Sequence, residues 1–402
     1  MSSLLLRGGI VIDTEPQPHV TEYTDILLED GRIAALGTGL SAPEVLDVTG
    51  RLVLPGFVDT HRHTWQAALG ATVADGTLAD YLARILHGYA PRYRPEDVYI
   101  GNLAGALDAA SSGTTTLLDW SQLNETPAHT EAAVDGLHAS GVRAVYAYPG
   151  APISTTPRTT FAYAASGPEH AGPQVAAEEW RAARELGLPI TVHMGGHGRE
   201  SADRGLAFLR NSGLLGPDIT YIHPNYYTDD QLRLIADTGG TASIAPISEA
   251  ALHIGYPAVG RLQAHGILTS LSSDSVTSGP GDMFSIMRTA YLFERARLAE
   301  DFTTRDVLRT ATIDGARVLG LAETTGSLRV GKQADLIVVR TDTLAMSALT
   351  DPIASLVLSA TPADVDTVLV AGEIVKHNGR LRNHDLSALR ATLLESARYL
   401  AA

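Results

Sequence analysis

The sequence predicts an α/β protein: a (β/α)8 TIM barrel with a small β-sandwich domain formed by the N- and C-terminal segments. Three observations support this prediction. From Pro55 onward, short apolar runs alternate with alanine-rich helical stretches, which is typical of βα units around a parallel sheet. Eight such runs occur, and barrels of this type usually span about 250 residues. Both ends of the chain contain short strands separated by turn signals.

Helices are expected between the barrel strands, at Pro95–Ser111, Ala128–Ser140, Val175–Leu186 and Asp229–Thr238. The segment Pro149–Pro173 is rich in Thr, Pro, Gly and Ala, and its length indicates either a lid over a site or a surface insertion without a role. The predicted barrel strands are Leu54–Asp59, Thr114–Asp119, Arg143–Tyr148, Phe161–Ala165, Pro189–His193, Ile219–His223, Ala242–Pro246 and Ile267–Asp274.

The two ends of the chain resemble each other in composition and strand length. Ser3–Asp13 is apolar and a turn follows at Glu29–Gly31, while Asp335–Arg340 and Val365–Val370 repeat the pattern after residue 325. We therefore expect residues 1–54 and 326–402 to pair into the β-sandwich domain. A catalytic barrel of residues 55–325 would be inserted between them.

Composition excludes several kinds of chemistry. The 402 residues include 30 Lys and Arg against 45 Asp and Glu, a net charge of −15 at pH 7, which argues against a nucleic-acid partner. There is no cysteine, so any metal must be held by His and carboxylate side chains. Because neither a secretory signal pattern nor a membrane-length apolar run is present, we expect a cytoplasmic enzyme without a membrane partner.

Metal-capable side chains recur where predicted strands end. His61 and His63 close the first strand at i and i+2, so their side chains point the same way. His193, His223 and Asp274 close the fifth, sixth and eighth strands. Any one histidine taken alone is more often a core or surface residue. Five such groups at the catalytic end of one barrel would leave costly unpaired polar groups if buried without a cation, so we expect a divalent metal site.

The chain resembles the amidohydrolase superfamily. The resemblance rests on PGFVDTHRH (55–63), the strand-terminal His193 and His223, Ser273-Asp274-Ser275, and GSLRVGKQADLIVV (326–339). The most similar branch is that of aminohydrolases and chlorohydrolases acting on nitrogen heterocycles, which includes cytosine, guanine and S-adenosylhomocysteine deaminases and triazine hydrolases. The resemblance covers nearly the whole chain, and it specifies the fold more closely than the substrate.

The resemblance implies one divalent metal ion held by His61, His63, His193 and Asp274, zinc in first place with iron or manganese as alternatives. A metal-bound hydroxide would attack the substrate, with Asp274 accepting the proton of the water and His223 orienting it or stabilising charge. Two-metal relatives carry a carboxylated lysine or a glutamate on a middle strand. Neither residue occurs in the third or fourth predicted strand, which favours one metal.

The fifth strand departs from the pattern of the deaminases. Relatives that deaminate purines or pyrimidines carry His-x-x-Glu there, and the glutamate donates to the ring nitrogen. This chain has Gly196 at that position, inside His193-Met-Gly-Gly-His197-Gly. His197, Glu200 and Glu249 are candidates to replace the glutamate, each with an ordinary surface role as the alternative. The adjacent glycines would also open room beside the metal.

Substrate contacts are expected from residues near the strand ends. Trp65 could stack on a flat ring and Gln66 could bind ring donors and acceptors, although Trp65 could equally fill the core. Trp120 and Glu249 are further substrate-binding candidates, while Asp119 is expected to orient a loop. His87 and Tyr89 are weaker candidates for the same contacts.

The expected function is therefore a metal-dependent hydrolase of C–N or C–X bonds in a small, cyclic, nitrogen-containing compound, with an aminohydrolase reaction on a heterocycle in first place. A cyclic amide or amidine ring-opening hydrolase is the alternative that Gly196 suggests. A catalytically silent small-molecule binding protein is the alternative from another class. The resemblance further suggests a homodimer or a higher homo-oligomer.

Overall fold

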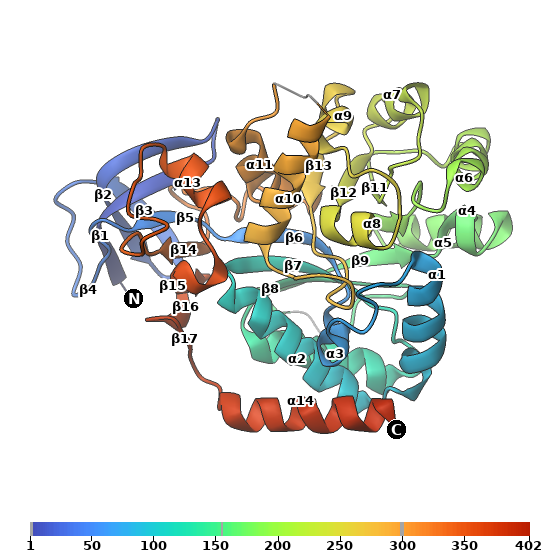
Figure 1. Cartoon of the computed structure of the whole chain (residues 1–402), viewed down its shortest axis with the longest axis horizontal. Coiled ribbons are helices and arrows are strands. Elements are labelled where there is room, and N and C mark those ends of the chain that lie inside the picture. The colour runs from blue at the N-terminus through green and yellow to red at the C-terminus, as the bar shows by residue number, and fades with distance from the viewer. Residues whose placement is uncertain (1–2, 154–155, 298–300) are drawn as a thin grey trace.

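The computed structural model describes residues 3–153, 156–297 and 301–402, and its strands form two separate sheets (Figure 1). One is an eight-stranded parallel sheet from the middle of the chain, and the other is a nine-stranded mixed sheet from both ends. The prediction of a (β/α)8 barrel with a second, terminal β structure is thus confirmed. Among the described residues, no helix is long and apolar enough to cross a membrane.

The barrel strands pair in parallel, each with its neighbour in the chain. The first one begins at Phe57 and not at Leu54, and the last one ends at Leu271, three residues before Asp274. The barrel strands are β6 (Phe57–Arg62), β7 (Thr114–Trp120), β8 (Arg143–Tyr148), β9 (Thr159–Ala165), β10 (Ile190–His193), β11 (Ile219–Ile222), β12 (Thr241–Ile244) and β13 (Thr269–Leu271).

The barrel closes where the segment after β13 meets β6. The backbone N–H of Asp274 donates to the carbonyl of His61 at 2.9 Å, and the N–H of His63 donates to the carbonyl of Asp274 at 2.9 Å. Deeper inside, the Thr60 hydroxyl hydrogen-bonds to Ser243 and Ser270 at 2.8 and 2.7 Å. Hydroxyls thus satisfy one another in the buried interior.

The terminal sheet is one continuous hydrogen-bonded sheet in the order β17-β16-β15-β14-β5-β1-β2-β3, with β4 beside β1. Strand β5 joins the two ends of the chain, because it pairs with β1 on one edge and with β14 on the other. Its strands are β1 (Ser3–Asp13), β2 (His19–Glu29), β3 (Arg32–Gly37), β4 (Glu44–Asp47), β5 (Leu52–Pro55), β14 (Leu336–Val339), β15 (Val365–Val370), β16 (Glu373–His377) and β17 (Arg380–Leu381).

Gly56 explains why the first predicted barrel strand divides into two. The chain leaves the terminal sheet at β5 and enters the barrel at β6, and Gly56 is the single residue between them. A Cβ at this position would lie 2.2 Å from the side chain of Thr115. Only glycine lets the backbone pass this close to β7. The domain boundaries given above remain a prediction.

The four helices expected from the sequence are present as α2, α3, α5 and α7, with ends within two residues of the predicted ones. The 3-10 helices η1 (Thr64–Leu69), η3 (Ala90–Arg92) and η4 (Pro362–Asp364) and the π-helix η2 (Leu82–Tyr89) accompany the α-helices. The α-helices are α1 (Leu78–Tyr81), α2 (Pro95–Ser111), α3 (Pro127–Ser140), α4 (Gly167–His170), α5 (Pro173–Glu185), α6 (Arg199–Asn211), α7 (Asp229–Asp237), α8 (Pro246–Ala251), α9 (Val259–Ala264), α10 (Met283–Ala296), α11 (Thr304–Thr310), α12 (Ile313–Val318), α13 (Pro352–Leu358) and α14 (Leu386–Ala401).

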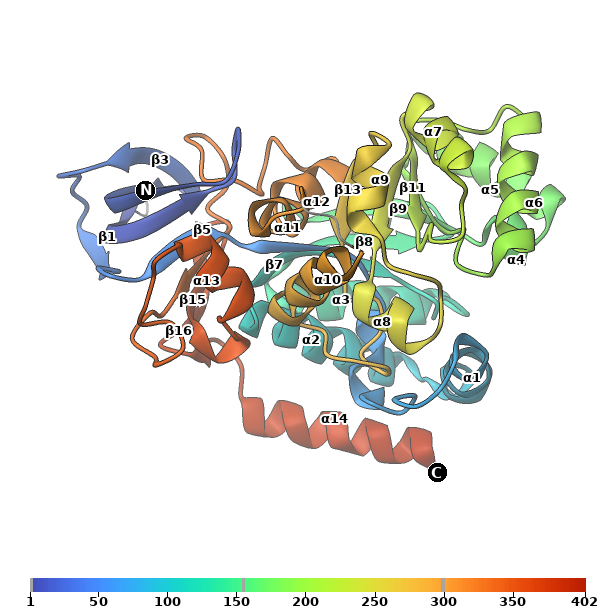
Figure 2. The same cartoon turned by 45° about the horizontal axis from the view of Figure 1, so that its top comes forward.

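Helix α14 was not expected in the C-terminal segment. It leaves the terminal sheet and runs along the barrel, next to α2 (Figures 1 and 2). Arg92 donates to the carbonyl of Leu400 at 2.7 Å, and the guanidinium of Arg94 lies 3.8 Å from the ring centre of Tyr399. The last residues of the chain therefore contact the barrel and not the sheet that precedes them.

A buried ion pair connects the barrel to the terminal sheet. Asp335, just before β14, accepts hydrogen bonds from Arg143 of β8 at 2.7 and 3.1 Å and from the backbone N–H of Ala371 at 2.6 Å. Both charged side chains are almost completely buried. Removal of one partner leaves the other charge unpaired in a low-dielectric environment.

We expect Asp335→Ala to lower the free energy of unfolding by about 3–5 kcal/mol, because Arg143 then remains buried without its counter-charge. Chemical denaturation followed by circular dichroism measures the change. The exposed Asp230, paired with Arg233 at the surface, provides the control, and Asp230→Ala should leave the unfolding midpoint unchanged. Equal midpoints for the two variants would contradict this account of the domain junction.

Candidate active site

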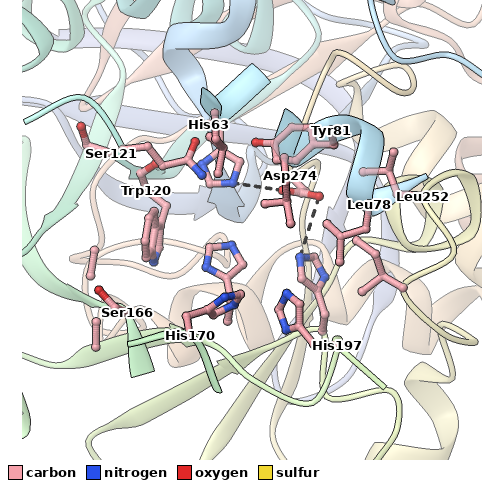
Figure 3. A pocket seen from close by; sticks show the side chains of 18 of the residues that line it. His63, Leu78, Tyr81, Trp120, Ser121, Ser166, His170, His197, Leu252 and Asp274 are labelled. Carbon is pink, nitrogen blue, oxygen red and sulfur yellow. Dashed lines mark hydrogen bonds and ion pairs between the residues drawn. The ribbon is translucent and has the colours of Figure 1, made fainter. Parts of the chain in front are cut away.

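Four imidazoles and one carboxylate converge at the carboxyl end of the barrel. Figure 3 labels two of these residues, His63 and Asp274. The five side chains come from β6 and the residue after it, from the ends of β10 and β11, and from the segment after β13. Within each of the two groups that they form, the potential ligand atoms lie within 4.8 Å of one another. The groups are His61, His63 and Asp274, and His61, His193 and His223.

The distances within this cluster are short for side chains of this kind. Asp274 Oδ1 lies 3.3 Å from the Nε2 atoms of both His61 and His63, and His193 Nε2 lies 3.2 Å from His61 Nε2. His223 Nε2 is farther away, at 3.8 Å from Asp274 Oδ2. Barrel closure produces this arrangement, since it places the end of β6 beside Asp274.

Two of the cluster residues have strained backbones. The φ angles of His223 and Asp274 are 60° and 58°, in the left-handed region that non-glycine residues rarely adopt. Such a conformation costs on the order of 1–3 kcal/mol and persists where the surrounding structure enforces it. Here it turns both side chains from the strand ends toward the centre of the barrel mouth.

Other residues fix the orientation of two imidazoles. His63 Nδ1 hydrogen-bonds to the carbonyl of Trp120 at 2.9 Å. Since a carbonyl only accepts, Nδ1 carries the proton and Nε2 offers a lone pair to the cluster. His223 Nδ1 contacts Glu249 Oε1 at 2.8 Å, and the same oxygen accepts the N–H of Ala245 at 2.9 Å.

The ionisation of the cluster suits a cation. Burial lowers the pKa of His61 to about 3 and the pKa of His193 well below its usual value, so both are neutral at pH 7. Burial alone would raise the pKa of Asp274, but its polar contacts with His61 and His63 lower the pKa well below its usual value. Neutral imidazoles and an ionised carboxylate are the donor set of His/Asp metal sites, so the residues fit a divalent ion.

His223 differs from the other cluster histidines. Burial lowers its pKa, yet the hydrogen bond to Glu249 and the charge of Asp274 outweigh this effect, and the net pKa is raised. Its Nδ1 proton is held by Glu249, which leaves Nε2 directed toward Asp274. This side chain is therefore suited to donate a hydrogen bond to a reacting atom.

The cluster lies at the edge of a cavity of about 360 Å³. This size fits a small ring compound. Helix α1 and η2 form one wall, Pro149 and residues between 164 and 170 form a second, and residues 252 and 254 after α8 close a third. The cavity is lined by His63, Leu78, Tyr81, Leu82, Leu86, Trp120, Ser121, Gln122, Asn124, Pro149, Ala164, Ala165, Ser166, His170, His193, His197, His223, Leu252, Ile254 and Asp274.

The long segment Pro149–Pro173 thus contributes to the cavity and is not a surface insertion without a role. Pro149, Ser166 and His170 all line it. Residues 154 and 155 of this segment lie outside the described part of the chain.

Trp120 is the predicted substrate-binding residue that does line the cavity. Its ring lies edge-on to the imidazole of His193, with ring centres 4.6 Å apart. Its indole N–H donates weakly to the carbonyl of Thr191 at 3.4 Å. The indole can therefore contact a flat ring bound beside the histidine cluster.

Three other predicted contacts are not where we expected them. Trp65 is buried in the core against Tyr93, with ring centres 4.9 Å apart, so it does not reach the cavity. Gln66 and Glu249 are completely buried behind the cavity wall, where they hold Tyr81 and His223. Side chains that directly follow a metal-binding motif can point into the cavity or into the core. Here the 3-10 helix η1 decides the direction for Trp65 and Gln66.

The weaker candidates also lie elsewhere. His87 and Tyr89 of η2 are not among the residues that line the cavity, and Glu200 is exposed on α6. Asp119 is completely buried and accepts the N–H of Thr64 at 2.9 Å, which fixes the start of η1. Burial raises the pKa of Asp119 to about 6. Its contacts agree with the expected role of orienting a loop.

His197 lines the cavity and is paired with a carboxylate that sequence analysis missed. Its Nδ1 lies 3.5 Å from Glu169 Oε2, and the other oxygen of Glu169 accepts the N–H of Gly195 at 2.9 Å. The Glu169 side chain is completely buried, and the ring of His170 lies 4.1 Å from that of His197. Figure 3 shows both imidazoles across the cavity from His63 and Tyr81.

Sequence analysis missed two further features. Glu169 and His170 lie in the segment expected to be a loop, where no pattern marked them. Tyr81 ends α1, which begins with a capping box of Thr77 and Asp80, and Leu78, Leu82 and Leu86 follow at helical spacing. That spacing was the available signal for a helix facing a cavity.

The expected room beside Gly196 is absent. A Cβ at Gly196 would lie 2.8 Å from Ile254 Cγ2 and 3.0 Å from the Cβ of His223. A Cβ at Gly195 would lie 2.7 Å from the ring of Tyr227, and its φ is +89°. The glycines permit close packing of the β10 loop against His223, and a glutamate at position 196 would collide with these neighbours.

Comparison with known proteins finds one matching family model and, among the relatives, several deaminases. Residues 52–375 match the family model described as "Amidohydrolase family". The chain is 28% identical to a 5'-deoxyadenosine deaminase of Methanosarcina mazei, covering 95% of this chain and 94% of the relative. It is also 28% identical to a 5-methylthioadenosine/S-adenosylhomocysteine deaminase of Symbiobacterium thermophilum, covering 99% of both chains.

Solved structures share the fold. An adenosine deaminase from Xanthomonas campestris with bound zinc superposes with a TM-score of 0.91 at 24% identity, covering 99% of this chain and 98% of the other. A variant of atrazine chlorohydrolase from Arthrobacter aurescens, complexed with zinc and atraton, gives 0.90 at 20% identity over 98% of this chain and 100% of the other.

We expect the purified protein to bind one equivalent of a divalent metal, and we expect His61→Ala and Asp274→Asn to abolish this binding while the far-UV circular dichroism is unchanged. Elemental analysis after dialysis against each metal measures the stoichiometry. Metal at a hundredfold excess over its Kd should stabilise the wild type by about 2.7 kcal/mol. Full metal content in both variants would place the ion outside this cluster.

We expect Gly196→Ala to lower the melting temperature, since the added methyl group collides with Ile254 and with the Cβ of His223. We also expect it to reduce metal affinity, because the loop that shifts directly follows the expected ligand His193 at the end of β10. Differential scanning fluorimetry with and without metal measures both effects. Gly37→Ala is the matched control, because a Cβ there meets nothing within 4 Å. Wild-type behaviour of Gly196→Ala would show that the β10 loop has room for a side chain.

Proposed function

Because this chain belongs to the amidohydrolase family, we propose that it is a metal-dependent aminohydrolase that releases ammonia from a small, neutral nitrogen heterocycle. The family makes it a hydrolase of C–N bonds other than peptide bonds. The observation that carries the proposal is the convergence of four imidazoles and one ionised carboxylate at the edge of a ring-sized cavity. The similarity of this chain to 5'-deoxyadenosine and 5-methylthioadenosine/S-adenosylhomocysteine deaminases over nearly its whole length supports the same reaction.

His61, His63, His193 and Asp274 are the proposed ligands of one divalent ion, zinc in first place because structural relatives contain it. When bound, the ion supplies Lewis-acid chemistry and lowers the pKa of a coordinated water to about 7. Iron and manganese suit the same donor set.

Asp274 and His223 have complementary roles in the proposed reaction. Asp274 is ionised at neutral pH, so it can accept a proton from the attacking water and deliver it to the departing amine. His223, held by Glu249, can donate a hydrogen bond through Nε2 to charge that develops on the attacked group. Glu249 is thus a positioning residue rather than a substrate contact.

His197 is our candidate for the proton donor that Gly196 cannot provide. Its imidazole lines the cavity, and buried Glu169 lies on its Nδ1 side at 3.5 Å, which favours a proton there. When the ring carries a proton on both nitrogens, the Nε2 proton is then the one available for donation. Carboxylate–imidazole pairs of this kind orient general acids and bases. Burial and the neighbouring His197 lower the pKa of His170 to about 4, so His170 is neutral and does not compete for the proton.

The walls of the cavity select for a neutral substrate. Of the described residues that line it, none is lysine or arginine, and Asp274 is the one carboxylate. Away from the metal site, a phosphate or carboxylate group would therefore find no lysine or arginine partner among the described lining residues. Leucine side chains on one side and Trp120 on the other suit the faces of a planar ring. Amino-acid-bearing nucleosides, which relatives accept by name, fit this lining less well than uncharged rings.

Ring opening of a cyclic amide or amidine is the second candidate. The observation that favours it is Gly196, because the structure has no glutamate at the position where deaminases carry one. The same cluster would then attack a ring carbonyl or amidine carbon, and the nitrogen would remain in the product. Association into a homo-oligomer remains a prediction.

A substrate panel tests the proposal. We expect the zinc-loaded enzyme to release ammonia from uncharged amino-heterocycles such as 5'-deoxyadenosine, adenine, cytosine or melamine, and Asp274→Asn to be inactive. A coupled glutamate dehydrogenase assay measures ammonia, and mass spectrometry detects ring-opened products from hydantoin and dihydrouracil. Turnover of the cyclic amides alone would establish ring opening instead.

The same assay examines His197. We expect His197→Ala to lower kcat by about 10²–10³-fold at unchanged metal content, because a positioned acid–base group contributes on this scale. Glu169→Gln should shift the acid limb of the pH–rate profile, since Glu169 acts through His197. Glu200→Gln on the exposed face of α6 is the control. Unchanged kcat in His197→Ala would remove this residue from the mechanism.

A further inference from the structure

Tyr81 presents an unused hydroxyl group to the cavity, and neither the family match nor the sequence pattern assigns it a role. It is the last residue of α1, its side chain lines the cavity, and only 5% of the residue is exposed. Figure 3 shows it on the same side of the cavity as His63 and Asp274. A buried hydroxyl in this place requires a hydrogen-bond partner.

The partner on the protein side is a chain of buried polar groups. Gln66 Nε2 donates to the Tyr81 oxygen at 2.6 Å, and Gln66 Oε1 accepts the hydroxyl of Ser275 at 2.7 Å. Ser275 in turn contacts the hydroxyl of Thr277 at 2.6 Å and accepts the N–H of Thr277 at 3.2 Å. All four side chains are almost completely buried, so water does not compete for these bonds.

The direction of this chain determines what Tyr81 can do. Hydrogen bonds that run from Thr277 through Ser275 and Gln66 end on the Tyr81 oxygen as acceptor, and each bond polarises the next. No bond in this series of hydrogen bonds therefore uses the proton of the Tyr81 hydroxyl group. Gln122, which also lines the cavity, interacts with the same hydroxyl group. Among the described residues, the hydrogen bond to Gln66 is one that the Tyr81 oxygen accepts, so it leaves the tyrosine proton available. Burial and the nearby charge of Asp274 raise the pKa of Tyr81, so the proton stays on the oxygen at neutral pH.

We propose that Tyr81 is a specificity-determining residue that donates a hydrogen bond to an acceptor atom beside the attacked carbon of the substrate. The inference rests on the proposed function and adds to it the nature of the substrate atom. This role requires a substrate with a ring nitrogen or carbonyl oxygen next to the reacting carbon. Negative charge develops on that nitrogen or oxygen atom during the attack.

Tyr81 and His197 then divide the task of the absent glutamate. His197 lies across the cavity from Tyr81 (Figure 3), with Glu169 at 3.5 Å from its Nδ1, so the two sides of a bound ring would contact different groups. Tyr81 stabilises charge on the acceptor without giving up its proton. His197 gives one proton to the ring and regains one from the added hydroxyl group as that group becomes the product carbonyl, so the two protons of the attacking water end on the departing amine and on the ring. A protein with Gly196 can thus retain aminohydrolase chemistry.

A matched pair of unreactive rings tests the proposal. Purine carries a nitrogen beside the carbon that would be attacked, and 1-deazapurine has C–H at that position with the same five-membered ring. Isothermal titration calorimetry on the zinc-loaded protein measures both dissociation constants. We expect the wild type to bind purine about 5- to 10-fold more tightly, which is the usual worth of one neutral hydrogen bond.

The variant Tyr81→Phe should bind both rings equally, because the donor is gone while the ring packing is kept. Tyr93→Phe is the control, since it removes another buried hydroxyl that hydrogen-bonds to Trp65 and does not line the cavity. It should retain the preference for purine. Equal wild-type affinities, including no binding of either ring, or an undiminished preference in Tyr81→Phe, would overturn the assignment.

The substrate panel separates this inference from the proposed function. Ammonia release with equal affinities for the two rings would refute the role of Tyr81 and leave the aminohydrolase assignment intact. With an active substrate, Tyr81→Phe should lower kcat/KM by about 10- to 100-fold. Gln66→Leu should cause little further loss of kcat/KM when Tyr81 is already Phe, because Gln66 acts through Tyr81. Losses that add fully in the double variant would show that Gln66 does not act through Tyr81.

Discussion

The closure of the barrel between β6 and the segment after β13 is the constraint on which the site depends. Two backbone hydrogen bonds fix His61, His63 and Asp274 in register, although more than 200 residues separate them in the sequence. Each of these residues serves at once as a structural link and as a member of the polar cluster. A change that loosens the closure would therefore separate the cluster before it unfolded the barrel.

The cluster in turn organises its surroundings. Three buried imidazoles and the partly buried His193 beside one carboxylate are unstable as a packed core. The structure supports them with strained backbones at His223 and Asp274 and with outer hydrogen bonds to the Trp120 carbonyl and to Glu249. Such outer contacts set the tautomer and direction of a ligand, and this is the usual design of a metal site. The loops then add Tyr81 and His197 on opposite sides of the cavity.

The sequence was most informative where a physical pattern repeats. Eight apolar runs predicted the parallel strands, and polar residues at the ends of four of them predicted the cluster. It was least informative about side-chain direction. Trp65 and Gln66 follow the histidine motif directly, but the η1 turn directs both away from the cavity, and no periodicity in the sequence encodes that turn. Helix α14 was also missed, because its environment is a distant surface of the barrel.

What the sequence by itself determined is the order of strands and helices and the inventory of chemical groups: histidines and a carboxylate at strand ends, no cysteine, and no glutamate at position 196. These follow from local preferences and composition. Only the tertiary structure decided which groups meet, because closure of the barrel, close approach at Gly56 and Gly196, and the fold of the Pro149–Pro173 segment depend on contacts between residues far apart in the chain. Glu169 beside His197 and Gln66 beside Tyr81 are products of those contacts.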